Sequence, residues 1–348
     1  MSDAVVGSLL GTAVGDALGL PYENLSPRRA AKLLGAADRY RFFFRRGFVS
    51  DDTEHSCLVL QALITSNRDP DKFEAELGRR LKWWFIKLPA GVGRATARAC
   101  IKLWLGFPPA KCGVFSAGNG PAMRSAIFGA LIDDVDLLVE LVGRSARLTH
   151  SDPKAEFGAI AVALAAWHGR TQSQIDPTAY LREVSERLPT SPEANELRTL
   201  LDTVAQSVAD GETTGCYCER TYSPKGVSGY TYHTVPAAIH AWLTSPDDFR
   251  QAVSNIIQCG GDADSTAAIV GGIVGARERK AGIPAEWLDG LAEWPCTKSW
   301  MIQLASSSSS IDGSRTRMRT PFFRQCLRNL VFLVVVLFHG FRRLLPPY

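Results

Sequence analysis

A chain of 348 residues can form one large domain or two ordinary ones, each with a packed interior. Its 46% hydrophobic and 21% charged residues are typical of a folded soluble protein and exclude disorder for most of the chain. The net charge of +4 is uneven: the segment from Ile311 onward carries +6, so residues 1–310 carry −2. A mildly acidic main part argues against a nucleic-acid-binding face, and we expect no nucleic-acid partner.

Apolar residues recur at helical spacing along most of the chain, whereas the alternating pattern of a half-buried strand is almost absent. Ser2 can cap a helix that runs to about Leu18. Further helices are expected from Thr53 to Thr65 and over residues 73–87, 94–105, 121–132, 154–168, 187–208, 234–243, 248–258 and 265–280. This pattern predicts an all-α fold, a compact orthogonal bundle of many helices.

The helix expected over 265–280 carries glycine and alanine where leucine would be ordinary, above all between Ala267 and Ala276. Glycine inside a helix costs about 1 kcal/mol relative to alanine. Small residues let neighbouring backbones approach closely, so we expect this helix to lie in the middle of the bundle.

The end of the chain differs from the rest. Residues 306–310 are five serines, a linker composition, and an Arg-rich stretch and the apolar run Leu330 to Phe338 follow. We therefore expect a catalytic domain over 1–300 and a serine linker with an Arg-rich apolar tail over 301–348. The apolar run is shorter than the roughly 20 residues that span a bilayer, although it could make weak contact with an anionic membrane surface. A subunit contact and an unstructured appendage are the alternatives.

Of the eight cysteines only Cys216 and Cys218 are close in sequence, and no second pair of cysteine or histidine residues has the spacing of a zinc site. We therefore expect reduced, partly buried thiols. The start of the chain lacks the basic flank of a signal peptide, and we predict a cytoplasmic location.

Two acidic clusters stand directly before predicted helices: Ser50-Asp51-Asp52-Thr53 and Gly260-Gly261-Asp262-Ala263-Asp264-Ser265-Thr266. Each could be no more than a helix cap, because serine and aspartate are preferred there and the helix dipole favours acids in a first turn. Two such clusters, each richer in acids than a cap needs, favour a metal site instead. Hydroxyl and carboxylate oxygens suit Mg²⁺ or Mn²⁺, and four carboxylates would balance two divalent ions.

Five motifs in order resemble the ADP-ribosylglycohydrolase family, whose members include glycohydrolases that activate dinitrogenase reductase. They are GSLLGTAVGDALG at residues 7–19 with Pro21-Tyr22-Glu23, SDDT at 50–53, GNGPAMR at 118–124, LTHSD at 148–152 and GDADS at 261–265. The resemblance covers residues 5 to about 290 and implies an all-α fold with a binuclear metal cleft.

The resemblance also implies roles for individual residues. The metal ligands would be Ser50, Asp51, Asp52, Asp262, Asp264 and Ser265, and the diphosphate and ribose would be held by Ser116, Gly118, Asn119 and Gly120. Some members have an aspartate where this chain has Ser116. Glu23 would be the catalytic proton shuttle, although a surface acid after a proline turn would look the same. His150 would hydrogen-bond the ligand, or be a structural histidine. Tyr230 and Tyr232 are candidates to stack on adenine, or ordinary core or surface aromatics.

The function that the resemblance implies is metal-dependent hydrolysis of the glycosidic bond between ADP-ribose and a protein side chain. Arginine is favoured as the residue that carries ADP-ribose, and serine is the alternative. The protein would act as a monomer on an ADP-ribosylated protein and release ADP-ribose. The alternatives are a hydrolase of another ADP-ribose derivative or phosphoester, and a non-catalytic ADP-ribose-binding member. Four unneutralised carboxylates speak against the last, because a binding protein has little need for them.

Overall fold

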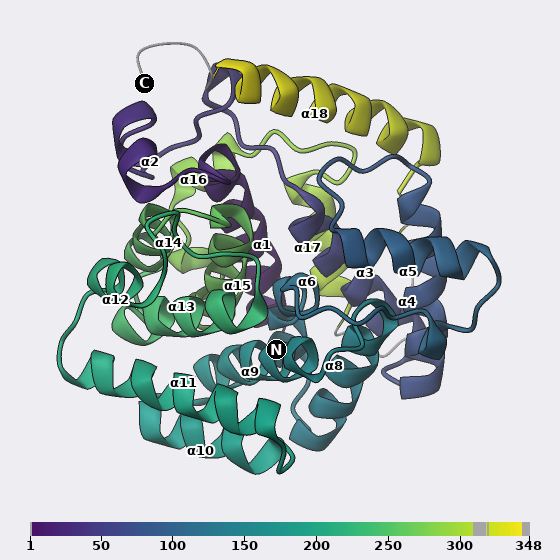
Figure 1. Cartoon of the computed structure of the whole chain (residues 1–348). Helices are drawn as coiled ribbons and strands as arrows, with labels where there is room; N and C mark the ends of the chain where they lie inside the picture. The colour runs from purple at the N-terminus through teal and green to yellow at the C-terminus, as the bar shows by residue number, and fades with distance from the viewer. Residues whose placement is uncertain (1, 309–317, 319, 343–348) are drawn as a thin grey trace.

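The structure, a computed structural model, describes residues 2–308, 318 and 320–342. In this part of the chain helices account for all the regular structure, and pairing between extended segments is limited to isolated β-bridges. The all-α prediction is confirmed, and Figure 1 shows the arrangement of the helices. Their buried side chains form a shared apolar core.

The helices up to residue 150 are α1 (Ser2–Gly19), α2 (Pro27–Leu33), α3 (Asp51–Ser66), α4 (Pro70–Phe85), α5 (Arg94–Trp104), α6 (Gly120–Met123), α7 (Ala126–Leu131) and α8 (Val135–Thr149), with short 3₁₀ helices η1 (Leu20–Tyr22), η2 (Phe43–Arg45) and η3 (Pro109–Lys111). The later ones are α9 (Pro153–Thr171), α10 (Pro177–Arg187), α11 (Pro192–Ala209), α12 (Thr214–Thr221), α13 (Thr231–Thr244), α14 (Phe249–Gln258), α15 (Ala263–Gly282), α16 (Ala285–Gly290), α17 (Lys298–Ser307) and α18 (Phe322–Arg342).

Helices α1 and α15 form the centre of the bundle, and small residues let them approach closely. A Cβ atom on Gly11 would lie 2.1 Å from the carbonyl oxygen of Gly271, and one on Gly15 would lie 2.0 Å from that of Ala267. Neither distance leaves room for a side chain, so the glycines are required by the contact. The central position predicted for the Gly/Ala-rich helix is confirmed.

Two helices expected from periodicity are each divided in the structure. The segment 121–132 forms α6 and α7, because Ser125 Oγ bonds the Pro121 carbonyl and the Ser125 N–H turns to Ala122, three residues back. The segment 187–208 is broken after Arg187, since prolines at 189 and 192 cannot donate the N–H bonds that a continuous helix needs. The helices that were not predicted are α2, α8, α10, α12, α16, α17 and α18.

Helices α17 and α18 continue the packed structure beyond the domain boundary expected at residue 300. Met301 and Leu304 of α17 are buried, and α17 contacts α1 and α3. The serine run begins inside α17, while its end and the following arginines up to residue 317 lie outside the described residues. Helix α18 lies along the outside of the molecule, the yellow helix of Figure 1. The apolar run Leu330 to Phe338 is thus part of a 21-residue helix.

Candidate active site

The acidic segments before α3 and α15 lie against each other. Ser265 Oγ donates a hydrogen bond to Asp52 Oδ2 at 3.3 Å, and Ser50 Oγ donates to the same oxygen at 2.9 Å. Helix α1 packs against both α3 and α15, and the N-terminal ends of α3 and α15 meet. Segments distant in the sequence therefore form one cluster of carboxylates and hydroxyls, at two helix ends whose dipoles favour negative charge.

Two carboxylates of this cluster are buried without sufficient partners. Asp52 and Asp264 each have one oxygen, Oδ1, that is buried and makes no hydrogen bond to any described residue. Burial raises the pKa of both carboxyl groups well above the usual range, and neighbouring carboxylates raise it further. Because buried polar atoms normally have partners, these oxygens fit a positively charged ligand.

The donor set suits a hard divalent cation, although its geometry is not that of a formed metal site. Among the described residues, no three His, Cys, Asp or Glu side chains are grouped closely enough to hold an ion as they stand. The two unpaired carboxylate oxygens and the adjacent serine hydroxyls are nevertheless the ligand types that Mg²⁺ and Mn²⁺ prefer. The binuclear site stays a prediction.

Asp16 is a residue of this site to which the sequence motif assigned no role. It is fully buried on α1 and accepts hydrogen bonds from the Ser50 N–H at 2.9 Å, the Thr53 N–H at 3.2 Å and Thr53 Oγ1 at 2.5 Å. Burial raises the pKa of Asp16 to about 6 against the lowering effect of these bonds. Its carboxylate holds the start of α3 against α1. An acid near the end of a mostly apolar helix, where the helix dipole does not favour it, was the available signal.

Glu23 lies at the edge of the acidic cluster. The Asn24 N–H donates to the Gly261 carbonyl at 2.7 Å, and the Gly261 N–H donates to the Leu25 carbonyl at 2.8 Å. These bonds fasten the segment after η1 to the loop that precedes Asp262. Burial raises the pKa of Asp264, and the negative charge of Glu23 raises it further.

The Gly-Asn-Gly loop before α6 joins the same cluster. Asn119 Nδ2 donates to Asp262 Oδ2 at 2.7 Å and to Thr234 Oγ1 at 3.1 Å. Gly118 and Gly120 lie against the ring of His150, and a Cβ on Gly120 would approach it to 2.8 Å. Burial lowers the pKa of His150 to about 3, so the ring is neutral at pH 7. Ser116 is also in the loop, where its Oγ accepts from the Gly118 N–H.

The two candidate tyrosines occupy different environments. Tyr232 is buried, and its hydroxyl donates to the Glu193 carbonyl at 2.6 Å, so it is a core residue. Tyr230 is half-buried, pairs through its backbone with Gly118, and accepts a hydrogen bond from Lys154 Nζ at 2.9 Å. Of the pair, Tyr230 is the one next to the Gly-Asn-Gly loop.

Arg124 supports the Gly-Asn-Gly loop, although the sequence analysis assigned it no role. Its buried guanidinium donates to the Ser145 carbonyl and to Thr149 Oγ1, both at 2.8 Å, and to the Gly120 carbonyl at 3.2 Å. These bonds attach the loop to α8 just before His150. The last residue of the GNGPAMR motif therefore orients the loop.

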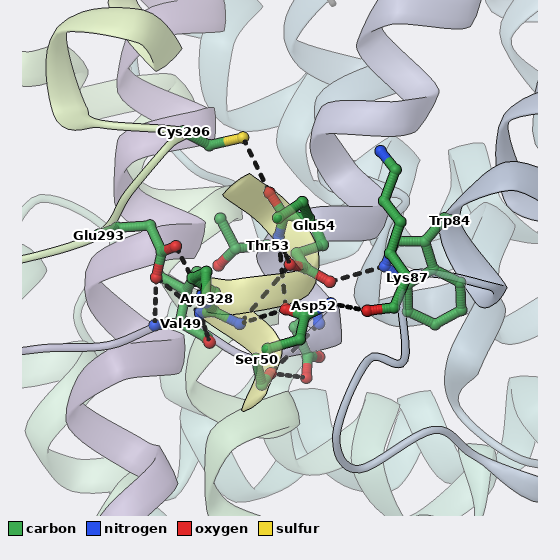
Figure 2. A network of polar contacts seen from close by, with 12 residues as sticks. Val49, Ser50, Asp52, Thr53, Glu54, Trp84, Lys87, Glu293, Cys296 and Arg328 are labelled. Atoms are coloured by element: carbon green, nitrogen blue, oxygen red, sulfur yellow. Dashed lines mark hydrogen bonds and ion pairs between the residues drawn. The ribbon is translucent and has the colours of Figure 1, made fainter. Parts of the chain in front are cut away.

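A second buried network links α18 to the first acidic segment (Figure 2). Arg328 forms two hydrogen bonds to Glu293, at 2.8 and 2.6 Å, and donates to the Val49 carbonyl at 2.5 Å. Glu54, next to the SDDT motif, accepts from Gln325 at 2.5 Å and from Trp84 at 2.6 Å. The C-terminal helix α18 thus binds Val49, the residue directly before Ser50. No local sequence pattern predicted this contact.

Comparison with known proteins identifies the chain. A model of the family described as ADP-ribosylglycohydrolase matches residues 1–317. The chain belongs to the ADP-ribosylglycohydrolase family. The resemblance drawn from the five motifs is thereby confirmed. Family membership indicates a hydrolase that acts on ADP-ribose linkages, and this family generally depends on divalent metal ions.

Similar proteins span most of the chain. A protein of Archaeoglobus fulgidus is 31% identical over 305 residues, which cover 84% of this chain and 93% of its own. The ADP-ribosyl-(dinitrogen reductase) glycohydrolase of Rhodospirillum rubrum is 27% identical over 299 residues, covering 83% of this chain and 90% of its own. A solved ADP-ribosylglycohydrolase-related protein complex aligns with a TM-score of 0.64 and 25% identity, covering 88% of this chain and 97% of that one.

Proposed function

We propose that this ADP-ribosylglycohydrolase hydrolyses the glycosidic bond between ADP-ribose and a protein side chain, with divalent metal ions as cofactors. The observation that carries the proposal is the contact between Asp52 and Ser265, which joins the two acidic segments into one cluster. Membership of the family supports the reaction class. The substrate is an ADP-ribosylated protein, and the product is free ADP-ribose.

The residues that would hold two Mg²⁺ or Mn²⁺ ions come from both helix starts: Ser50, Asp51, Asp52, Asp262, Asp264 and Ser265. When bound, such ions supply positive charge that orients the ribose hydroxyls and makes a nearby water more acidic. Asn119 keeps Asp262 in place through its hydrogen bond to Oδ2, and Asp16 keeps the start of α3 in place.

Glu23 is the proposed proton shuttle. Cleavage at the anomeric carbon of ribose needs an activated water and a proton for the departing group. The carboxylate of Glu23 accepts a proton from the attacking water, and the resulting carboxyl group returns it to the departing side chain. The backbone bonds between Leu25 and Gly261 keep Glu23 beside the acidic cluster.

The loop around Asn119 binds the rest of the substrate. Ser116 and the backbone of Gly118 and Gly120 hold the diphosphate and ribose, since glycines leave backbone N–H groups accessible to phosphate. Neutral His150 serves as a hydrogen-bonding group for the ligand. Tyr230, whose backbone pairs with Gly118, stacks on adenine.

Arginine is the proposed attachment residue, and serine is the alternative. Four ligand carboxylates balance two divalent ions, so the charge of Glu23 remains in excess at the edge of the cluster. An excess negative charge favours a cationic guanidinium over the neutral oxygen of serine.

The test uses peptides that carry ADP-ribose on arginine or on serine, incubated with the protein with and without EDTA. We expect metal-dependent release of free ADP-ribose, faster from arginine. Asp262→Ala should abolish both metal binding and release, and Glu23→Gln should lower kcat by about 100-fold or more, as for the loss of a general acid–base group.

Controls come from exposed acids on other helices. Asp202→Ala on α11 and Glu219→Gln on α12 make the same chemical changes away from the cluster and should leave turnover unchanged. Release of AMP or phosphate would instead indicate a phosphoester hydrolase. Ligand binding without turnover would indicate a binding protein.

A further inference from the structure

Helix α18 packs on the molecule with a mixed side, on which Phe332 and Val335 are buried among polar residues, and it exposes an apolar side. Gln325, Arg328, Asn329 and His339 are buried against the body. The outward stripe, which we name the α18 surface, is 50 to 84% exposed and comprises Phe323, Leu327, Leu330, Val334, Leu337 and Phe341. Surface helices of soluble proteins expose polar residues, so the α18 surface needs a partner outside the described part of the molecule.

Apolar residues from two loops extend this surface. Phe44 is 93% exposed and lines a hollow with Phe338 of α18, and Leu88 is 64% exposed beside Lys87, whose carbonyl accepts from Asn329. Phe44 and Leu88 have φ angles of 55° and 58°, in the left-handed region that bulky side chains avoid. Two strained backbones that present large apolar groups beside the same helix favour a binding role.

The charge around the α18 surface is positive at both ends. Helix α18 carries no acidic residue, and Arg324 is exposed in its first turn. At the other end Arg39, Arg41 and Arg45 line a hollow of about 370 Å³ together with Phe338. Asp38 pairs with Arg39 and Arg41, so three arginines and one aspartate leave a net charge of +2 there. Exposed apolar residues flanked by arginines suit an anionic membrane surface, because the apolar groups can enter the headgroup region while the arginines contact phosphate.

A second copy of the chain fits this surface less well. The six residues of the stripe have coiled-coil spacing, but Val331, Leu333 and Phe338 beside it are also apolar and exposed. A coiled-coil seam is narrow and is flanked by charges that pair across the interface. Here the flanks are apolar and the helix has arginines only, so two copies would bring like charges together.

We propose that the α18 surface binds an anionic phospholipid bilayer, with the helix lying in the headgroup region and Arg39 and Arg45 contacting lipid phosphates. By length and composition α18 could also cross a membrane, as could Ser2–Tyr22, which is wholly buried in the core. The buried bonds of Arg328 to Glu293 and Val49 keep α18 on the body, so it rests on the bilayer and does not span it. This binding is separate from hydrolysis.

The test is co-sedimentation of the full chain with vesicles of phosphatidylglycerol and phosphatidylcholine, or of phosphatidylcholine alone. We expect binding to the anionic vesicles at least about tenfold tighter, weakening with added salt, as for basic surfaces on anionic lipid. Val334→Glu combined with Leu337→Glu should abolish it. Arg39→Gln combined with Arg45→Gln should weaken binding to anionic vesicles by about tenfold or more, from roughly fivefold per arginine.

The matched control is Leu105→Glu combined with Ile101→Glu, which puts two acids on residues of 72% and 48% exposure at the end of α5 and should bind vesicles like the unchanged chain. Thermal unfolding of every variant verifies that the fold is intact. Failure to sediment with either kind of vesicle, or equal binding to both, would overturn the proposal. So would protein that alkaline carbonate does not release from the vesicles, because that behaviour indicates a spanning helix. A dimer in light scattering that the α18 variants abolish would also overturn it.

Discussion

At the scale of single residues, the acidic cluster destabilises the folded protein when no metal is bound. Asp52 and Asp264 are buried, each has an oxygen without a partner, and each lies near other carboxylates. Such an arrangement raises the free energy of the metal-free folded protein, because burial and like charges both oppose ionisation. The arrangement is reasonable where a cation compensates it. Stability and function therefore make opposite demands on these positions.

Asp264→Asn should stabilise the metal-free protein at pH 7 by about 1–2 kcal/mol, since it removes a carboxyl group whose folded-state pKa is raised. It should also remove the increase in melting temperature that Mg²⁺ gives the unchanged protein. Thermal unfolding with EDTA and with Mg²⁺ measures both effects.

The sign of the pH dependence follows from the direction of the shift. A carboxyl group with a raised folded-state pKa contributes stability at low pH and loses it as pH rises through that pKa. The advantage of Asp264→Asn in EDTA should thus widen from pH 4 towards pH 8. Asp202→Asn, on exposed α11, should show no such widening, and an advantage that shrinks with pH would contradict the burial argument.

At the scale of elements, the contact between α1 and α15 positions the site. Both acidic segments depend on it, since α1 carries Asp16 and α15 begins with Asp264 in its first turn. The backbones approach so closely at Gly11 and Gly271 that a single methyl group would separate the helices.

Gly11→Ala should destabilise the protein by about 3 kcal/mol or more, because the new Cβ would lie 2.1 Å from the Gly271 carbonyl oxygen. Gly169→Ala in α9 is the matched control. Its Cβ would have no neighbour closer than 3.7 Å, so the higher helix propensity of alanine should leave stability unchanged or raise it slightly. Chemical denaturation of both variants measures the difference. Equal effects would show that the two helices can move apart freely.

At the scale of the whole molecule, the C-terminal helix is joined to the site through buried polar groups. Arg328 connects Glu293, which follows α16, with Val49, which precedes the SDDT motif (Figure 2). A mostly apolar helix thereby becomes part of the support for the first acidic segment.

Arg328→Met should destabilise the protein by about 3–5 kcal/mol, because it leaves the buried Glu293 carboxylate without its partner. Adding Glu293→Gln should recover a large part of the loss, since no unpaired buried charge then remains. A double-mutant cycle in urea measures the coupling. If the double variant is as unstable as the sum of the single ones, the pair is not coupled.

The local sequence was sufficient for the fold class, most helices, the family and the list of site residues to inspect. Helical periodicity, caps and short motifs depend on neighbours within a few positions, and these interactions persist in any fold that the chain adopts. The same reasoning failed where bonds within a single turn interrupt a helix, as at Ser125. It also treated the apolar run after Leu330 as separate from the body.

Only the tertiary structure decided which groups meet. The contact of Asp52 with Ser265, the support of Asp16 for Ser50 and Thr53, and the bond from Arg328 to Val49 join residues far apart in the chain. No local pattern contains such pairings, because they depend on how closely α1 and α15 pack and on which side of α18 faces the body. The sequence by itself determined the chemical groups available to this protein, whereas packing determined which of them share a buried environment.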